Sequence, residues 1–307
     1  MTKAYVGRFA PSPTGPLHLG SLVAALGSWL DARAHHGQWL LRLEDLDRER
    51  EQAGASAAIV DTLAALGMRA DGPVIRQQDR RDHYERALAE LLAQGRVFRC
   101  SCTRREIRLQ QPPGAQAPDS PADPDGGPPY PGTCRQGPRR AEGPHVLRLR
   151  VDDEPVCWQD RPAGHANGVR QWVELRRQCG DFALRRADGT PTYQLAVVVD
   201  DAAFGVTDVV RGADLASSTA RQRLLQTCLG VPHPRTLHLP LVLADDGQKL
   251  SKQTGALGVD AHGPAAARVA LLNEALSFLQ LGPIRADSVD AFMAEAIKRW
   301  QSSPWMS

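Results

Sequence analysis

The sequence predicts an α/β fold in which a parallel sheet is interrupted by a smaller α/β insertion. Short apolar runs alternate with longer stretches that have helical spacing, and this alternation is typical of parallel sheets. The 307 residues, 42% of them hydrophobic and 23% charged, can bury a sizeable core. The expected parts are a first half of the sheet domain (1–97), an insertion (98–190), a second half (191–240) and a final loop followed by helices (241–307).

The first half of the sheet domain begins with an apolar run and a loop rich in proline and glycine. The expected elements are a strand at 5–9, a helix from Leu22 to about Ala34, a strand at 39–43, and helices near 54–66 and 79–94. Ligands of parallel sheets bind at the carboxyl ends of the strands. Arg8 and Glu44 lie at two of these predicted ends, so they are candidate ligand-binding residues.

The insertion and the second half follow the same reasoning. The expected elements are strands at 97–99 and 145–151, a helix at 193–204, a strand at 206–210, and helices at 217–229, 264–281 and 287–300. Residues 112–131 are dense in Pro, Gly and Asp, so a mobile loop is expected over 103–133.

Composition excludes several classes of protein. No apolar run approaches the length of a membrane span, and the first motif begins too early for a signal peptide to precede it. The net charge of +2 does not by itself indicate a nucleic-acid partner, although residues 76–108 hold nine arginines against five acids. That segment is either a phosphate-facing patch or a solvated helix face. The six cysteines are unevenly spaced, which favours a cytoplasmic chain over a disulfide scaffold.

One motif lies between Arg8 and Ser21, with the sequence Arg-Phe-Ala-Pro-Ser-Pro-Thr-Gly-Pro-Leu-His-Leu-Gly-Ser. A loop that enters a helix amino terminus binds anions readily, because unpaired N–H groups point outward there. His18 stands near that end and can help to hold a phosphate. A second motif, Lys249-Leu250-Ser251-Lys252-Gln253, contains two of the four lysines of the chain. This use of lysine in an arginine-rich chain favours a point-charge ammonium over a planar guanidinium at this place.

The two motifs together resemble the two ATP-binding signatures of class I aminoacyl-tRNA synthetases, and Arg-Phe-Ala-Pro-Ser-Pro-Thr-Gly resembles the glutamyl branch. This resemblance implies a Rossmann-like sheet, ATP with Mg²⁺, and catalytic roles for His18 at the phosphates and Lys252 at the departing pyrophosphate. It implies that ATP is bound by His18, Gly20, Ser21, Lys249, Ser251 and Lys252. Leu250 and Gln253 depart from the usual Met and Ser of the second signature. Nucleotidylyltransferases share the phosphate loop and remain an alternative.

The resemblance also implies a pocket for L-glutamate, which carries two carboxylates and one ammonium. Arginine suits the carboxylates because it binds them bidentately. The implied pocket residues are Arg8, Phe9, Ala10, Pro11, Ser12, Glu44, Tyr193 and Arg211, with Glu44 at the ammonium. The sequence leaves open which arginine meets which carboxylate. Longer members of the family have a histidine shortly after the Arg-Gly, where this chain has Asp214-Leu215-Ala216.

A metal site is expected in the insertion, because Cys100, Cys102 and Cys134 offer three thiolates and structural zinc is usually four-coordinate. The resemblance implies Tyr130 as the fourth ligand of one structural Zn²⁺. The residues themselves leave Asp123, Asp125 and His145 open as alternatives.

About 55 residues follow the lysine motif, whereas conventional members of the glutamyl branch carry a further large helical region that reads the anticodon. The chain resembles a short subgroup that attaches glutamate to the queuosine base of tRNA(Asp). The implied partners are ATP, L-glutamate and queuosine-bearing tRNA(Asp). The implied enzyme is a cytoplasmic monomer that does not charge tRNA(Glu) and binds no membrane. Two alternatives are a short enzyme that charges a 3′ end and a non-catalytic tRNA-binding relative. The presence of both His18 and Lys252 argues against the second.

Overall fold

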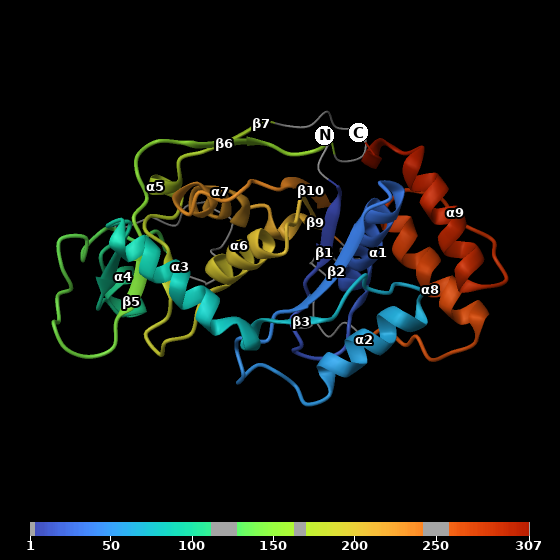
Figure 1. Cartoon of the computed structure of the whole chain (residues 1–307), viewed down its shortest axis with the longest axis horizontal. Helices are drawn as coiled ribbons and strands as arrows, with labels where there is room; N and C mark the ends of the chain where they lie inside the picture. Colours follow the sequence, from blue (N-terminus) through green and yellow to red (C-terminus); the bar gives the residue numbers. More distant parts are fainter. Residues whose placement is uncertain (1–3, 112–127, 163–169, 242–257, 307) are drawn as a thin grey trace.

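A computed structural model describes residues 4–111, 128–162, 170–241 and 258–306. The parallel sheet at its centre contains β1 (Val6–Phe9), β2 (Gln38–Leu43) and β3 (Ile75–Arg76), paired in that order. A second parallel pair consists of β9 (Asp208–Gly212) and β10 (Arg235–Leu239). The backbone N–H of Thr207 donates to the Val6 carbonyl at 2.9 Å, so β9 begins beside β1. The strands therefore follow the order β3, β2, β1, β9, β10 (Figure 1).

Helices connect and cover these strands. Helix α1 (Leu19–Ala34) joins β1 to β2, and its residues Leu22, Leu26 and Leu30, spaced by four, are fully buried. The remaining helices of the sheet domain are α2 (Ala55–Ala65), η1 (Gln77–Arg80), α3 (Arg81–Ala93), α6 (Tyr193–Ala203), η2 (Ala213–Leu215) and α7 (Ser218–Cys228). None of the described helices combines the length and the hydropathy that a bilayer span requires.

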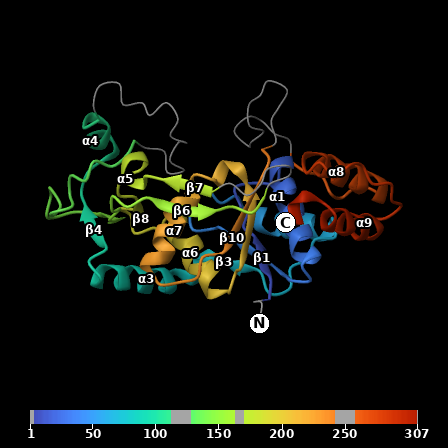
Figure 2. The same cartoon turned by 90° about the horizontal axis from the view of Figure 1, so that it is seen from above.

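The insertion contains an antiparallel sheet and a hairpin. Its elements are β4 (Val97–Cys100), α4 (Arg104–Leu109), β5 (Val146–Leu149), β6 (Val156–Gln159), β7 (Arg170–Val173), α5 (Leu175–Gln178) and β8 (Ala183–Arg185). The sheet has the order β4, β5, β8, and β6 pairs with β7. Figures 1 and 2 both place this hairpin beside α7, so it reaches from the insertion to the sheet domain.

The prediction of a loop over 103–133 is wrong at its beginning, where α4 forms. Thr103 accepts a hydrogen bond from the Glu106 backbone N–H at 3.2 Å, and the Glu106 carboxylate accepts from the Thr103 N–H at 2.6 Å. This reciprocal capping satisfies two N–H groups that would otherwise lack partners at the start of the helix. Residues 112–127 lie outside the described part of the chain.

The chain ends in α8 (Ala265–Phe278), α9 (Val289–Gln301) and η4 (Pro304–Met306). Leu272, Phe292 and Trp300 belong to the hydrophobic cluster that also contains the buried side of α1. Helices α8 and α9 thus pack on the sheet domain beside α1. Figure 1 shows them at the end of an elongated molecule opposite the insertion, with the parallel sheet in between. Sequence reasoning did not predict β3 or β10.

Candidate active site

His18 lies at the amino terminus of α1, at the carboxyl side of β1. Its Nδ1 atom accepts a hydrogen bond from the Ser21 backbone N–H at 3.2 Å, and its Nε2 lies 3.0 Å from the Ser21 hydroxyl. His18 is thus the N-cap residue of the helix. Gly20 lies in the first turn and, as a glycine, adds no side chain there. The arrangement presents an imidazole beside the partial positive charge of a helix amino terminus, which favours an anionic ligand.

Lys249, Ser251 and Lys252 lie outside the described residues, which stop at Leu241 and resume at Gly258. The described chain resumes beside the His18 loop, because the Val259 N–H donates to the Leu17 carbonyl at 2.8 Å. A Cβ on Gly258 would lie 2.8 Å from the Pro16 ring, which shows how closely the two segments approach.

The structure brings together Arg8, Glu44, Tyr193 and Arg211, which come from β1, the end of β2, α6 and β9. Burial raises the pKa of the Tyr193 hydroxyl above its usual value, while the nearby Arg211 charge opposes that shift and the Glu44 charge adds to it. Arg8 and Arg211 each have only 4% of their surface exposed. Arg8 and Arg211 are buried and Glu44 and Tyr193 are half-buried, so the four side chains form one cluster at the carboxyl ends of parallel strands.

Glu44 is the carboxylate of this cluster. Burial raises its pKa from 4.5 to about 7, against the opposing charges of Arg42 and Arg8. Arg42 Nη2 lies 3.5 Å from the Glu44 carboxylate, but its Nη1 is committed to Asp201 at 2.5 Å. Glu44 Oε1 is buried and has no hydrogen-bond partner among the described residues. Glu44 Oε1 faces Arg42 Nη2, so a cationic group that entered the pocket would share the carboxylate with this arginine.

The two buried arginines differ in their partners. Arg8 Nε lies 3.3 Å from the carboxylate of Asp201. Arg211 instead donates to Gln222 Oε1 at 2.9 Å, Thr219 Oγ1 at 2.8 Å and His238 Nε2 at 3.3 Å. Burial and the neighbouring Arg8 charge lower the pKa of Arg211, although Tyr193 opposes the shift. Within the described part of the chain, Arg8 has a counter-charge in contact and Arg211 has only uncharged acceptors.

The other residues expected in the glutamate pocket lie at the end of β1 and in the loop that follows it. The Phe9 ring is buried and stacks on Trp39, with ring centroids 6.3 Å apart, so this side chain belongs to the core. The Pro11 carbonyl accepts from the Glu44 N–H at 3.0 Å and thereby fixes the ends of β1 and β2 relative to each other. Ala10 is half-buried and Ser12 is exposed.

Sequence reasoning missed the acidic residues that support the pocket. Asp201 binds Arg8 and Arg42, and Asp200 accepts from Arg80 Nε at 2.6 Å and from Tyr84 Oη at 2.9 Å. Both aspartates are almost fully buried. The signal that could have revealed them is an Asp-Asp pair in the otherwise apolar helix 193–203, since buried carboxylates need cationic partners.

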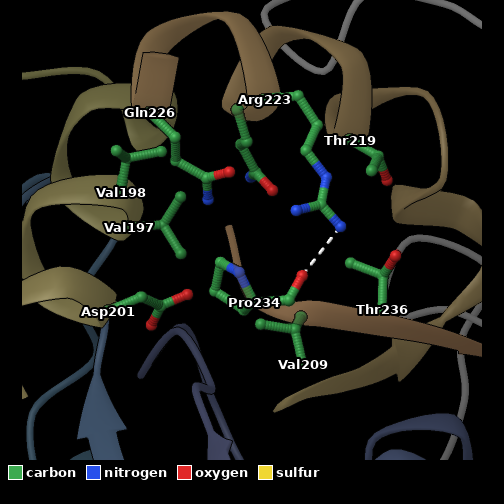
Figure 3. Close-up of a pocket in the computed structure, with 10 residues that line it drawn as sticks. Val197, Val198, Asp201, Val209, Thr219, Arg223, Gln226, Pro234 and Thr236 are labelled. Carbon is green, nitrogen blue, oxygen red and sulfur yellow. Dashed lines mark hydrogen bonds between the residues drawn. The ribbon is translucent and has the colours of Figure 1, made fainter. Parts of the chain in front are cut away.

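A small cavity lies between α6, α7, β9 and β10 (Figure 3). Its volume of about 10 Å³ is room for one water molecule. Thr219 and Gln222, which hold Arg211, also line this cavity. Gln226 Oε1 and Arg223 Nε are buried there and find no hydrogen-bond partner in the described part of the chain, so a polar occupant suits the site.

The insertion holds a candidate metal centre formed by Cys100, Cys102 and Cys134, called here the Cys cluster. The three Sγ atoms lie within 4.8 Å of one another, and those of Cys102 and Cys134 are 3.5 Å apart. Thiolates around a tetrahedral zinc lie about 3.8 Å apart, so the arrangement fits this ion. Tyr130 Oη lies 3.4 Å from Cys100 Sγ.

The electrostatics of the Cys cluster are uneven. Burial raises the pKa of Cys102 to about 12. Burial acts in the same direction on Cys134, but hydrogen bonds from the backbone of Arg139 and Ser101 outweigh it and bring the pKa to about 6. Burial and the Cys100 hydrogen bond raise the pKa of the Tyr130 hydroxyl. Only a bound cation would bring all these groups to their ionised forms at neutral pH.

The alternatives for the fourth ligand separate clearly. His145 Nε2 contacts the Arg140 carbonyl at 2.8 Å, and the described histidines and carboxylates do not join the Cys cluster. Asp123 and Asp125 lie outside the described residues. Tyr130 is held in place because its N–H donates to the Cys179 carbonyl at 3.0 Å and its hydroxyl accepts from the Cys134 N–H at 2.8 Å.

Comparison with known proteins agrees with this geometry. A family model described as tRNA synthetases class I (E and Q), catalytic domain, matches residues 5–276. Proteins named glutamyl-Q tRNA(Asp) synthetase from Verminephrobacter eiseniae and Bordetella bronchiseptica are 50% and 48% identical to this chain, covering 97% and 96% of it and 97% and 88% of their own lengths. The crystal structure of a glutamate–tRNA synthetase from Elizabethkingia anophelis matches with a TM-score of 0.74 and 27% identity; the match covers 95% of this chain but only 65% of that one. The chain therefore belongs to the class I tRNA synthetases of the E and Q type, among the ligases named glutamyl-Q tRNA(Asp) synthetases.

Proposed function

We propose that this ligase activates L-glutamate with ATP and transfers it to the queuosine base in the anticodon of tRNA(Asp). The observation that carries the proposal is the cluster of Arg8, Glu44, Tyr193 and Arg211, in a chain that matches relatives named glutamyl-Q tRNA(Asp) synthetase over nearly their whole length. The expected parts keep their roles in this proposal: 1–97 and 191–240 form the catalytic domain, 98–190 faces the RNA, and 241–307 carries the lysine motif and contacts the tRNA stem.

The pocket suits glutamate because its charges are complementary to the three charged groups of that substrate. Arg211, whose hydrogen-bond partners among the described residues carry no charge, supplies a positive charge to one carboxylate. Arg8 is partly neutralised by Asp201 and supplies a weaker attraction to the other. Glu44 holds the α-ammonium. Glutamine would leave a buried guanidinium without its counter-charge, which is costly, so the pocket discriminates against it.

In the proposed reaction the glutamate carboxylate attacks the α-phosphorus of ATP and pyrophosphate leaves. Such a step depends mainly on positioning and on stabilisation of charge. His18, Gly20 and Ser21 hold the phosphates at the amino terminus of α1, and Lys249, Ser251 and Lys252 complete the ATP site. Lys252 meets the charge on the departing pyrophosphate. Mg²⁺ accompanies ATP and is bound mainly through phosphate oxygens.

The Cys cluster and Tyr130 would hold one structural zinc ion. A bound zinc supplies no chemistry to the reaction; it fixes the geometry of the segment that connects β4 to β5. The enzyme acts as a cytoplasmic monomer in this proposal.

Two assays test the function. The first is glutamate-dependent ATP–pyrophosphate exchange, in which we expect activity from the native chain and a loss of at least about 100-fold in Arg211→Gln, since a buried charge partner is removed. The second is transfer of labelled glutamate to tRNA(Asp) with and without queuosine. Transfer to queuosine-bearing tRNA(Asp) alone supports the proposal. Transfer to the 3′ end of tRNA(Glu) would identify a short charging enzyme instead, and absence of exchange would point to a non-catalytic relative.

A further inference from the structure

We propose that His238 and Asp160 form a positioning pair that orients Arg211 while leaving its positive charge available to the substrate. The inference rests on the proposed function, because it assigns the support of a glutamate-binding arginine. His238 lies on β10 and Asp160 directly follows β6 of the insertion, so the pair connects the hairpin to the pocket.

The guanidinium of Arg211 is held at three points by acceptors that carry no charge. Gln222 and Thr219, one turn apart on α7, accept from Nη1 and Nη2 at 2.9 and 2.8 Å. His238 Nε2 accepts from Nε at 3.3 Å. The planar fork therefore has one allowed orientation, which is what bidentate recognition of a carboxylate requires.

The donor role of Arg211 fixes the proton on the imidazole of His238. Arginine can only donate, so Nε2 must be the unprotonated nitrogen and Nδ1 carries the hydrogen. Nδ1 lies 3.2 Å from Asp160 Oδ2 and donates to it. Burial lowers the pKa of His238, which keeps the ring neutral at pH 7. The charged groups that act on the ring are Asp160, Arg211 and Asp214.

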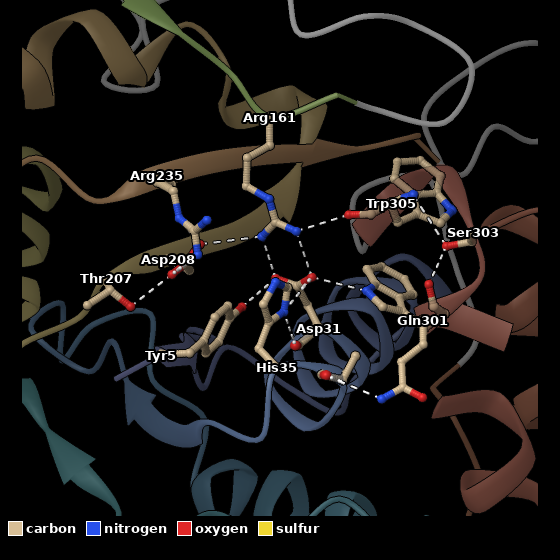
Figure 4. Close-up of polar contacts among 12 residues, drawn as sticks. Tyr5, Asp31, His35, Arg161, Thr207, Asp208, Arg235, Gln301, Ser303 and Trp305 are labelled. Carbon is tan, nitrogen blue, oxygen red and sulfur yellow. Dashed lines mark hydrogen bonds and ion pairs between the residues drawn. The ribbon is translucent and has the colours of Figure 1, made fainter. Parts of the chain in front are cut away.

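Asp160 is itself fixed on both sides. Its Oδ1 accepts from the Trp158 indole N–H at 3.0 Å and from the Thr236 hydroxyl. The next residue, Arg161, donates to Asp31 on α1 at 2.6 and 2.9 Å and to the Trp305 carbonyl at 2.9 Å (Figure 4). The end of the hairpin is therefore attached to the sheet domain at the place where Asp160 contacts His238.

The imidazole has an electrostatic consequence for the pocket. A carboxylate in direct contact with Arg211 would neutralise it, as Asp201 does for Arg8. With His238 between them, Asp160 orients the arginine through a neutral ring and stays one side chain away. Among the described residues no carboxylate contacts Arg211, so its positive charge can pair directly with a substrate carboxylate, and the pair favours both the affinity for glutamate and its selection over glutamine.

The test measures KM for glutamate, KM for ATP and kcat by pyrophosphate exchange. Loss of a hydrogen bond to a charged group costs about tenfold or more in binding, so His238→Ala is expected to raise KM for glutamate by at least about tenfold with little change in KM for ATP. His238→Gln restores an acceptor for Arg211 and is expected to recover most of that loss. Asp160→Ala should resemble His238→Ala, and Asp160→Asn, which can still accept from Nδ1, should be milder.

His233→Ala is the matched control, because His233 lies just before the same strand and contacts Thr227 instead of Arg211. We expect it to leave all three constants unchanged. Thermal unfolding of each variant separates a loss of folding from a loss of positioning. The inference is overturned if His238→Ala leaves KM for glutamate unchanged, or if His238→Gln is as impaired as His238→Ala. Failure of the proposed function would be recognised separately, because the native protein would then show no glutamate-dependent exchange or Arg211→Gln would leave it unchanged.

Discussion

At the scale of single residues, Glu44 is the group whose ionisation should be visible in the activity. Its pKa is about 7 in the substrate-free pocket, mainly because of burial. Only the ionised form attracts the ammonium of glutamate, so we expect KM for glutamate to rise as the pH falls below about 7. Exchange assays between pH 5.5 and 8.5 would show this. In Glu44→Gln the KM should exceed the native value above about pH 7 and should lose this pH dependence; a native pH profile in the variant would remove Glu44 from the pocket.

Glu44 should also make the stability of the fold depend on pH, but in the opposite direction: glutamate binding improves as the pH rises, whereas stability falls. The pKa of Glu44 is higher in the folded chain than its usual 4.5, so the folded state holds a proton that the unfolded state releases. The stabilisation is complete below pH 4.5 and is lost as the pH passes about 7. Relative to the native chain, Glu44→Gln should therefore gain up to about 3 kcal/mol in free energy of unfolding between pH 4.5 and pH 8. Urea titrations at the two pH values measure this; an equal difference at both would contradict it.

At the scale of an element, the segment between β4 and β5 depends on the Cys cluster for its geometry. Gly180 has φ +67°, and a Cβ there would lie 2.2 Å from the Tyr130 carbonyl oxygen, so only glycine allows Tyr130 to approach. We expect about one zinc ion per native chain by mass spectrometry under gentle conditions. Cys134→Ser should lose the metal, and Gly180→Ala should weaken its retention against a chelator. Cys157→Ser, at an exposed cysteine, is the control that should retain it. A metal-free native chain would refute the site.

At the scale of the whole molecule, Asp31 joins parts that are distant in sequence. Its fully buried carboxylate accepts from Tyr5 on the segment before β1, from Arg161 of the insertion and from Trp300 Nε1 on α9 at 3.0 Å (Figure 4). Removing it takes away the two short contacts of the buried Arg161 guanidinium, which then keeps, among the described carboxylates, only that of Asp208 at 3.4 Å, so Asp31→Ala should cost up to about 3–5 kcal/mol in free energy of unfolding.

The control for Asp31 is Asp152, which pairs with Arg96 at 2.7 Å on the surface. Asp152→Ala should cost at most about 1 kcal/mol, because exposed ion pairs are weak. Equal losses for the two variants, measured by urea unfolding, would show that Asp31 does not have this central role.

The sequence by itself determined the alternation of strands and helices, the two nucleotide motifs, the three clustered cysteines and the charged residues at the strand ends. These signals are local, because side-chain periodicity and loop composition depend on neighbouring residues. The α/β character and most elements could be predicted for this reason, and the expected pocket residues Arg8, Glu44, Tyr193 and Arg211 lie together in the structure.

Only the tertiary structure decided which charges remain available. Asp201 forms an ion pair with Arg8, whereas Arg211 donates hydrogen bonds to neutral acceptors on α7 and β10. No spacing in the sequence distinguishes the two arginines. The two-residue strand β3 and the contact of Asp160 with His238 could likewise not be predicted from the sequence, since they arise from contacts between segments far apart along the chain. Burial and pairing are properties of the folded chain, and they set the chemistry of a side chain whose identity the sequence already supplies.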